Sequence, residues 1–457
     1  MPASTTTLER AKLDQLIHEQ ERSFLDRQPR SAALAARAAR SLAGGVTSSW
    51  QITRPQPIWI DRGLGSKVYD VDGNEYVDLH GGYGVMLVGH AHPRVVGAVS
   101  DRIARGSHFA QPSEDAIVVA EELARRFRLP LWRFANSGTE ATMDAVHLMR
   151  AVTGRRKILK IEGAYHGHHD SVMVSVYDDM AELGPPQRPS SPQSGAGLPV
   201  EITGLTVIAQ FNDLVTLEAI VSEHEGELAG MILEPIMMNA GIVLPVEGYL
   251  RGVRDLTRRH GMLLAYDEVK TGLTVGPGGA TDLFGVTPDI VCLAKAMGGG
   301  LPCGAIGGTS DVMGLVVRRE YEQVGTFNGN PLTMVAARAT MCDVLDDAAY
   351  EHIESLQNDM VAGCQAVIAE YELPAHVVAV GAKGCIVFSP NPVRTFRDHL
   401  LIDERYSHCH WLFQHNGGVF LPPWGKAEQW LLSVQHTEDD VQRFLECFAR
   451  FARALRG

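Results

Sequence analysis

The chain has 457 residues, of which 45% are hydrophobic and 21% charged, and its formal net charge is −13 at pH 7. This size and composition predict two or three domains, or one large domain with appendages, with a sizeable core, and they exclude a disordered or fibrous protein. The acidic balance argues against nucleic-acid binding, which depends on a basic surface.

The terminal sequence and the cysteines indicate a cytoplasmic protein. The first residues, MPASTTTLERAKLD, contain no apolar stretch, and no apolar run in the chain approaches the ~20 residues that span a bilayer. The seven cysteines include no CxxC pair, which is typical of reduced thiols rather than of disulfides or zinc sites. We therefore expect neither a secretory signal nor a membrane segment.

The predicted elements begin with helices and then alternate between strands and helices. Residues 1 to about 43 have helical spacing, and KVYDVDGNEYVD (67–78) predicts a hairpin. A helix capped by Ser113 precedes buried strands at LWRFA, KILKI, LTVIA, GMILE, MLLAY and IVCLA, most of them separated by helices. This alternation predicts an α/β fold with a mainly parallel sheet covered on both faces. Residues beyond about 335 predict a separate α+β unit.

Polar residues follow three of these strands. Asn136, Ser137, Gly138 and Thr139 follow LWRFA, Asp267 and Glu268 follow MLLAY, and Lys295 follows IVCLA. Because ligands of doubly wound sheets bind at the carboxyl ends of the strands, these residues are expected to face one crevice. Lysine is scarce in this chain, and the other lysines mostly occur in polar contexts.

Each feature alone also has a simpler structural explanation. Ser-Gly-Thr before a helix is more often only an N-cap, and a lysine at a sheet end more often extends to solvent. The Asp-Glu pair resembles that of nucleotide hydrolases, but the chain has no G-x-x-x-x-G-K-[ST] and no G-x-G-x-x-G. These absences argue against a nucleotide hydrolase and against a dinucleotide site.

Taken together, the three features match the needs of pyridoxal 5′-phosphate (PLP). Its aldehyde needs a lysine, its pyridine nitrogen a carboxylate, and its phosphate a helix N-terminus. Lys295, Asp267 and the Gly138-Thr139 pair provide these groups. Burial lowers the pKa of a lysine and makes its amine a better nucleophile and base.

The sequence resembles the class III (ω-type) aminotransferases, most closely the branch that contains glutamate-1-semialdehyde aminomutase. The matching stretches, from about residue 65 to 335, are DVDGNEYVD, GHAHP, NSGTEATMDAV, AYHGHHD, LEPI, LLAYDEV, LAKAMGGGLPCGAIGG and GTFNGNPL. The resemblance implies the PLP-dependent fold type I, with a seven-stranded sheet in the large domain and a small α+β domain from both termini. It places an N-terminal arm and part of the small domain at 1–75, the large domain at 76–335 and the C-terminal small domain at 336–457.

The resemblance also implies roles for individual residues. Lys295 would be the Schiff-base lysine and proton shuttle, and Asp267 the partner of the pyridine nitrogen. The remaining cofactor contacts would be Val269, Tyr165 and His166 at the ring, Ser137, Gly138 and Thr139 at the phosphate, and Asn212 near the phenolic oxygen. Thr326 would reach the phosphate from a second subunit, which implies a homodimer with shared active sites. The Pro/Ser-rich stretch from Glu182 to Pro199 coincides with the mobile gate of this branch.

The expected substrate pocket departs from that of the aminomutase. In GGVTSSWQ, Gln51 stands where the aminomutase has an arginine for the substrate carboxylate, with Trp50 beside it. A neutral side chain cannot replace a bidentate guanidinium–carboxylate pair. Tyr83 falls where the family places an aromatic residue, and Trp424 adds a further one. The pocket is therefore predicted to suit a bulkier amine, an aromatic amino acid or a β-amino acid.

The leading hypothesis is a PLP-dependent aminotransferase that moves an amino group from an amine, β-amino acid or amino acid to a keto acid by a ping-pong mechanism. An aminomutase that transfers the group within one molecule is the alternative. Two less favoured alternatives are a PLP lyase acting on a phosphorylated amine and a non-catalytic homologue. HGHHD (166–170) has no second ligand group at suitable spacing, so no metal site is expected.

Overall fold

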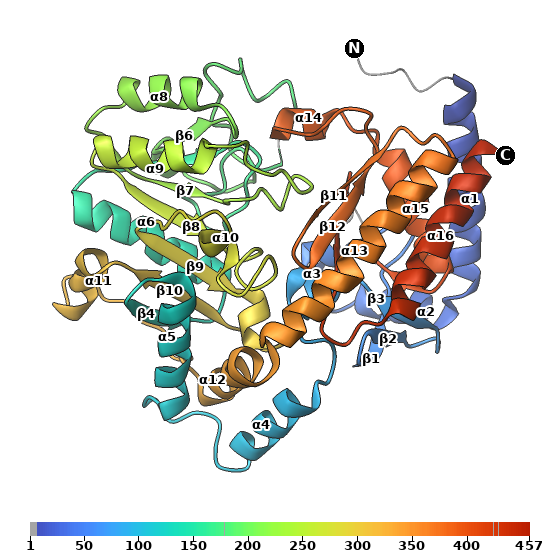
Figure 1. Ribbon diagram of the computed structural model, residues 1–457, viewed down its shortest axis with the longest axis horizontal. Coiled ribbons are helices and arrows are strands. Elements are labelled where there is room, and N and C mark those ends of the chain that lie inside the picture. The colour runs from blue at the N-terminus through green and yellow to red at the C-terminus, as the bar shows by residue number, and fades with distance from the viewer. Residues whose placement is uncertain (1–6, 178, 424, 428) are drawn as a thin grey trace. The chain divides into compact units, whose positions relative to one another are not determined.

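The computed structural model describes residues 7–177, 179–423, 425–427 and 429–457. The contacts between its Cα atoms divide the chain into two compact units (Figure 1). Unit 1 consists of Met1–His92, Glu351–Pro392 and Leu401–Gly457, and unit 2 of Pro93–Tyr350 and Val393–Leu400.

Unit 2 is built on a seven-stranded sheet of order β4-β10-β9-β8-β7-β5-β6. The strands are β4 (Leu131–Ala135), β5 (Lys157–Ile161), β6 (Thr206–Ala209), β7 (Leu228–Leu233), β8 (Leu263–Asp267), β9 (Ile290–Ala294) and β10 (Gly304–Gly308). Strands β5 to β9 run parallel, and β10 is antiparallel to both of its neighbours. Every residue of β7, β9 and β10 is buried, which requires cover on both faces because successive side chains point to opposite sides. The predicted mainly parallel sheet is confirmed.

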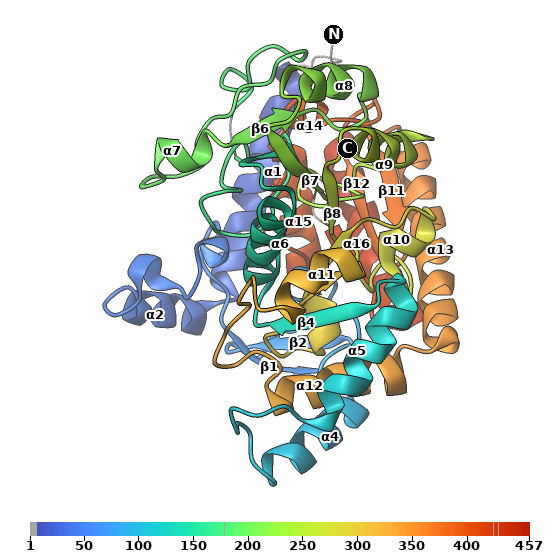
Figure 2. The ribbon, with the colours of Figure 1, turned by 90° about the vertical axis from the view of Figure 1, so that its left-hand side faces the viewer.

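The helices of unit 2 connect and cover these strands. They are α4 (Pro93–Ile103), α5 (Glu114–Phe127), α6 (Gly138–Thr153), α7 (Val200–Thr203), α8 (Leu214–Glu223), α9 (Tyr249–Arg259), α10 (Gly279–Leu283), η3 (Lys295–Gly298), α11 (Ser310–Val317), α12 (Pro331–Arg338), η4 (Ala339–Val344) and α14 (Phe396–Leu400). Helix α6 contacts five strands and lies beside α11 (Figure 2). Its residues Ala145 and Met149 share a buried core cluster with Ile232 of β7 and Met313 of α11. Each fully buried aliphatic side chain of this kind contributes about 1.5–3 kcal/mol.

Strand β10 is an element that the hydrophobic pattern does not reveal. Its sequence GAIGG is mostly glycine, and glycine is uncommon in strands. The structure explains the glycines, because a Cβ on Gly304 would lie 2.4 Å from the carbonyl oxygen of Ser137 and one on Gly307 2.5 Å from the ring of Trp132. The close approach of β4 and its neighbours to this backbone therefore depends on the missing side chains.

Unit 1 combines two small sheets with helices from both ends of the chain. Its elements are α1 (Thr7–Asp26), α2 (Pro29–Ala38), η1 (Ala43–Gly45), η2 (Ser49–Gln51), β1 (Ile60–Leu64), β2 (Lys67–Asp70), β3 (Glu75–Asp78), α3 (Gly81–Gly84), most of α13 (Asp347–Glu370), β11 (His376–Val380), β12 (Lys383–Val387), α15 (Glu404–Asn416), β13 (Val419–Phe420), β14 (Gln429–Leu431) and α16 (Glu438–Arg456). The sheets have the orders β1-β2-β3-β13 and β11-β12-β14. The predicted hairpin is formed by β2 and β3.

The N-terminal arm packs inside unit 1, as its helical pattern predicts. Helix α1 lies along α15, and Phe24 of α1 contacts the rings of Trp411 and His415. Beyond the helix, the Gln28 amide lies 2.7 Å from the Nε2 atom of His415. The arm is therefore part of the hydrophobic core of this unit.

The compact units divide after His92 and after Tyr350, whereas the resemblance places boundaries near residues 75 and 335. Strand β3 pairs with β13, and α3 contacts β14, so residues up to 92 associate with unit 1. Helix α12 and the π-helical turn η4 pack on α4 and α5, which keeps them with unit 2.

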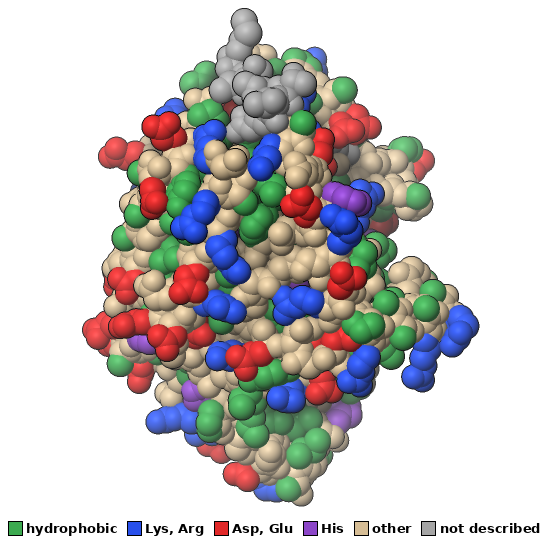
Figure 3. Space-filling view, turned by 90° about the vertical axis from the view of Figure 1, so that its right-hand side faces the viewer, with side chains coloured by type: hydrophobic (Ala, Val, Ile, Leu, Met, Phe, Trp, Pro, Cys, Tyr) green, Lys and Arg blue, Asp and Glu red, His purple; other side chains and the backbone are tan. Residues whose placement is uncertain are grey.

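Within the described ranges no helix is long and apolar enough to cross a membrane. Figure 3 shows one face of the molecule, on which Lys and Arg side chains are interspersed with Asp and Glu. No extended field of one sign covers that face.

Candidate active site

Lys295 lies at the carboxyl end of β9, where the chain turns into η3. Its φ of 52° places a non-glycine residue in the left-handed region, a strained conformation that is concentrated at functional sites. Burial lowers the pKa of the Lys295 amine below its ordinary value, and the nearby charges of Asp267 and Glu234 offset part of this effect. The amine is therefore more often neutral than that of an exposed lysine.

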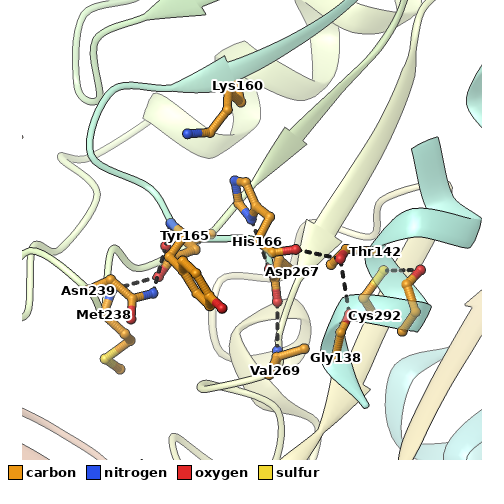
Figure 4. Close-up of polar contacts among 12 residues, drawn as sticks. Gly138, Thr142, Lys160, Tyr165, His166, Met238, Asn239, Asp267, Val269 and Cys292 are labelled. Carbon is orange, nitrogen blue, oxygen red and sulfur yellow. Dashed lines mark hydrogen bonds and ion pairs between the residues drawn. The ribbon is translucent and has the colours of Figure 1, made fainter. Parts of the chain in front are cut away.

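Asp267 ends the neighbouring strand β8 and is buried. Its Oδ2 atom lies 2.8 Å from Nδ1 of His166, and its Oδ1 atom accepts a hydrogen bond from the backbone N–H of Val269 at 3.0 Å. Figure 4 shows the carboxylate held between these two partners. The orientation of the carboxylate is thus fixed from two sides.

Tyr165 and His166 come from the loop after β5, and a second buried acid, Glu234, holds the backbone of Tyr165. The Glu234 carboxylate follows β7 and accepts from the backbone N–H groups of Tyr165 (2.9 Å) and Met238 (2.8 Å) and from the Asn239 side chain (3.0 Å). Burial raises the pKa of Tyr165 to about 12, with smaller contributions from Tyr177 and Asp267. The tyrosine therefore stays neutral and presents an apolar ring.

The N-terminus of α6 provides a third component. Ser137 caps the helix by accepting from the Glu140 N–H (3.2 Å), while the Glu140 carboxylate accepts from the Asn136 N–H (2.6 Å). The amides of Gly138 and Thr139 remain in the first turn, where the helix supplies no acceptor, so they are available to an anion.

Two glycine contacts join this helix end to the other groups. A Cβ on Gly138 would lie 2.8 Å from a methyl carbon of Val269, and one on Gly167 would lie 2.7 Å from Thr139. Val269 is hydrogen-bonded to Asp267, and Gly167 directly follows His166. The N-terminus of α6, the Asp267 carboxylate and the His166 loop therefore lie close together. The predicted proximity of the α6 N-terminus and the end of β8 is therefore present.

Two of the predicted substrate-pocket residues of unit 1, Trp50 and Tyr83, lie together. The Tyr83 hydroxyl donates to the Trp50 carbonyl (2.8 Å), and the two ring centroids are 5.5 Å apart. Tyr83 has a φ of 61°, again in the left-handed region. Gln51 is exposed, and its Oε1 atom accepts from the N–H (3.1 Å) and the hydroxyl (2.6 Å) of Thr47. Trp424 lies outside the described residues.

Asn212 and Thr326 lie in other surroundings. The amide of Asn212 donates to the carbonyls of Leu244 (3.0 Å) and Arg394 (2.9 Å), and its oxygen accepts from Val246 N–H (2.8 Å). These bonds use both amide protons to hold loop backbone. Thr326 is exposed in a surface pocket of about 550 Å³.

Three features of the site were not anticipated. Glu234 was not singled out, although an acid directly after an apolar strand was the available signal. Glu268 has a structural role, because it accepts from Thr271, Ala280 and Thr281 and thereby holds the start of α10. Lys160 and Lys383 are exceptions to the expectation that most of the other lysines lie in polar contexts, because both are buried.

The histidines of HGHHD diverge. His166 contacts Asp267, His168 is exposed, and Nε2 of His169 lies 3.5 Å from the Thr142 hydroxyl. Burial lowers the pKa of His169 to about 3. Over the part of the chain that the structure describes, no group of three or more His, Cys, Asp or Glu residues is arranged to hold a metal ion.

Comparison with known proteins shows the same relationship along most of the chain. Residues 50–439 match the family model of the class-III aminotransferases. The chain is 39% identical over 435 residues to glutamate-1-semialdehyde 2,1-aminomutase of Desulforudis audaxviator, covering 94% of this chain and 99% of the relative.

Two solved structures match with similar coverage. An omega-transaminase from Sphaerobacter thermophilus has a TM-score of 0.90 and 32% identity, over 95% of this chain and 100% of the other. A glutamate-1-semialdehyde aminomutase from Pseudomonas aeruginosa in complex with PMP has a TM-score of 0.89 and 30% identity, over 97% and 99%. The chain therefore belongs to the class-III aminotransferases, PLP-dependent enzymes of fold type I.

Proposed function

We propose that this enzyme transfers amino groups at the carboxyl edge of the unit 2 sheet, with Lys295 as the reactive amine. The observation that carries the proposal is the position of Lys295, a strand-end lysine with a lowered pKa on the strand next to the Asp267–His166 pair. When bound, PLP supplies an electron sink that allows a bond at the substrate carbon next to nitrogen to break.

The residues of the chain fit this cofactor. The backbone amides of Gly138 and Thr139, in the first turn of α6, suit a phosphate. Gly138 has no side chain, and a Cβ at this position would clash with the Val269 side chain. Asp267, held by His166 and Val269, would keep a proton on the pyridine nitrogen. Lys295, whose pKa is lowered by burial, would take the proton from the substrate carbon and return it to the carbon on the other side of the nitrogen. Tyr165 would lie on the ring.

Reductive trapping tests the proposal. Borohydride reduction of the purified enzyme, followed by peptide mapping, is expected to place a pyridoxyl group on Lys295. Lys295→Ala is expected to abolish the labelling. Lys270→Ala is the control, since the Lys270 ammonium donates to the Met238 carbonyl at 3.0 Å. A label on another lysine, or none in the unaltered enzyme, contradicts the assignment.

The comparisons favour the aminomutase over the intermolecular transamination that the sequence suggested first. The relative at 39% identity is named for moving an amino group between C2 and C1 of glutamate 1-semialdehyde. One local observation favours the second candidate, an aminotransferase. The Gln51 side chain is neutral, and its amide oxygen accepts hydrogen bonds from Thr47. It therefore provides no positive charge for a substrate carboxylate.

A substrate comparison separates the two reactions. An aminomutase converts glutamate 1-semialdehyde into its isomer without an added amine or keto acid. An aminotransferase instead consumes an amine donor and a keto acid in equal amounts, and its initial rates give the parallel double-reciprocal lines of a ping-pong mechanism. If the aminotransferase assignment is correct, Gln51→Arg should lower the KM of carboxylate-bearing donors, since a guanidinium forms the bidentate pair.

We further propose that the enzyme acts as a homodimer in which Thr326 serves the partner's site. Thr326 is exposed, and so are the apolar side chains of Val324, Phe327 and Phe109. Exposed apolar side chains near a functional residue are typical of an interface between subunits.

A mixing experiment tests the shared site. Lys295→Ala and Thr326→Asp homodimers are each expected to bind PLP poorly. After co-expression, the mixed dimer would contain one site with both native residues, so labelling of Lys295 is expected to return to about half of the native level. If Thr326 acts within its own subunit, both sites of the mixed dimer are defective and labelling does not return.

A further inference from the structure

The Pro/Ser-rich segment from Glu182 to Pro199 packs against the sheet despite having no regular secondary structure. The side chain of Leu183 is fully buried, and its carbonyl accepts from Ser190 N–H at 2.8 Å. The carbonyl of Pro192 accepts from Ser175 N–H at 2.9 Å. The segment is therefore held by the burial of Leu183 and by individual hydrogen bonds.

Arg397 of α14 makes the most extensive of these contacts. Its guanidinium donates to both carboxylate oxygens of Glu162, at 2.9 and 2.8 Å. It also donates to the carbonyls of Gly184 (2.8 Å) and Leu183 (3.1 Å). The exposed fractions of the two charged side chains are 13% for Arg397 and 1% for Glu162. A bidentate, nearly dry ion pair of this kind is costly to break from one side only.

The carboxylate of this pair stands at the start of the loop that carries Tyr165 and His166. Glu162 directly follows β5, and its N–H donates to the Ala209 carbonyl at 2.9 Å. The next residue, Gly163, has a φ of +76°, and a Cβ there would lie 2.2 Å from the ring of Phe396 on α14. Arg397 and Phe396 therefore hold α14 against the base of the active-site loop.

We propose that Arg397 is a positioning residue that clamps the segment Leu183–Pro192 to the loop Glu162–His166 and so fixes the alignment of Tyr165. The inference rests on the proposed function. The guanidinium contacts both the Pro/Ser-rich segment and the loop, through two carbonyls on one side and a carboxylate on the other. Removing it leaves the buried Glu162 charge unpaired and frees both segments together.

Hydrogen exchange of the holoenzyme, followed by mass spectrometry, tests the clamp. Arg397→Met keeps the aliphatic stem but removes all four bonds, and it is expected to speed exchange in Leu183–Pro192 and Glu162–Tyr165 at least about tenfold. Arg397→Lys keeps the charge without the planar fork and is expected to give an intermediate effect. Arg188→Met is the matched control, because Arg188 lies on the same segment but pairs with Glu223 at the exposed surface.

The outcomes distinguish the clamp from general stability and from the proposed function. Exchange that rises evenly over the whole chain, or equally in the Arg397→Met and Arg188→Met variants, overturns the inference. Glu162→Gln provides a second variant of native shape if Arg397→Met fails to fold, and it should loosen the same two segments. The clamp also predicts that Arg397→Met raises KM for the amino donor more than it lowers kcat. Loss of Lys295 labelling in the unaltered enzyme would instead refute the proposed function.

Discussion

At the scale of single residues, the contact between Gly138 and Val269 shows how closely the helix end approaches the acid. The methyl carbons of Val269 lie 2.8 and 2.9 Å from the position that a Cβ on Gly138 would take. These distances are shorter than carbon atoms tolerate, so any side chain at position 138 displaces Val269 or the helix end. Because Val269 N–H also orients Asp267, the disturbance would reach the carboxylate.

We therefore expect Gly138→Ala to weaken PLP binding. Overpacking by one methyl group costs about 1–3 kcal/mol, so the PLP Kd is expected to rise by roughly 5- to 140-fold. Val269→Ala removes the clashing methyl groups, and the double variant should recover much of the lost affinity. Equilibrium dialysis of PLP against the three variants measures this. An unchanged Kd in Gly138→Ala would show that the helix end can move at no cost.

Glu268 gives a second prediction at this scale. Its carboxylate accepts from the N–H groups of Ala280 (2.6 Å) and Thr281 (2.8 Å) and from two threonine hydroxyls. In Glu268→Gln, the amide NH₂ must face one of these backbone donors, which leaves a buried N–H without an acceptor. The loss of unfolding free energy is expected to be about 1–3 kcal/mol, measured by chemical denaturation. A variant as stable as the native enzyme would contradict this account.

Some residues of the site were predictable from sequence and others were not. Lys295, Asp267 and the Gly138-Thr139 pair were identifiable because each directly follows an apolar strand, and parallel strands end at one edge. Thr47 donates to Gln51 Oε1, and the Asn212 amide donates to the carbonyls of Leu244 and Arg394. These hydrogen bonds depend on loop conformations, which the periodicity of the sequence does not predict.

At the scale of secondary-structure elements, apolar periodicity predicts those strands that pack through large apolar side chains. It did not locate β10, because the packing of that strand depends on absent side chains at Gly304 and Gly307. The segment Glu182–Pro199 illustrates the same limit. Its composition indicated a loop, but its attachment through Arg397 comes from a residue more than 200 positions away.

Two hydrogen bonds attach the residues on either side of Thr326 to α6 and to Asn136, which precedes this helix. The Tyr321 hydroxyl donates to Oδ1 of Asp144 in α6 at 2.5 Å, and the Asn328 side chain accepts from Asn136 at 3.0 Å. Burial raises the pKa of the Asp144 carboxyl, while the bond from Tyr321 opposes the rise. The helix that would bind one phosphate thus also positions the threonine proposed for the partner's phosphate.

Tyr321→Phe is expected to loosen this attachment. The change removes one donor from a buried carboxylate, and the cost should be about 1–3 kcal/mol, with faster hydrogen exchange confined to residues 322–330. Asp144→Asn is the control, because the amide oxygen still accepts from Tyr321 and the effect should be smaller. Unchanged exchange in Tyr321→Phe would mean that the other contacts suffice to hold the segment.

At the scale of the whole chain, the histidines of the unit 1 core govern the response to acid. His410 lies among the rings of Phe388, Phe444 and Phe448, and His415 stacks on Tyr76 with the ring centroids 4.5 Å apart. Burial lowers the pKa of each imidazole from the ordinary 6.5 to about 3. Below pH 6.5 the unfolded chain therefore binds protons that the folded chain does not, and stability falls as the pH drops towards 3.

Each of the two histidines is expected to cost about 2 kcal/mol of unfolding free energy at pH 5 relative to pH 8. Tryptophan fluorescence reports on this unit, because Trp411 and Trp430 are buried in it. His410→Phe should remove about half of the pH dependence that His410 and His415 together contribute. In this variant the Gln414 amide keeps its bond to the Phe444 carbonyl at 3.1 Å. His18→Gln, on the exposed side of α1, should leave the pH dependence unchanged. Equal pH dependence in all three proteins would place the acid-sensitive group outside this core.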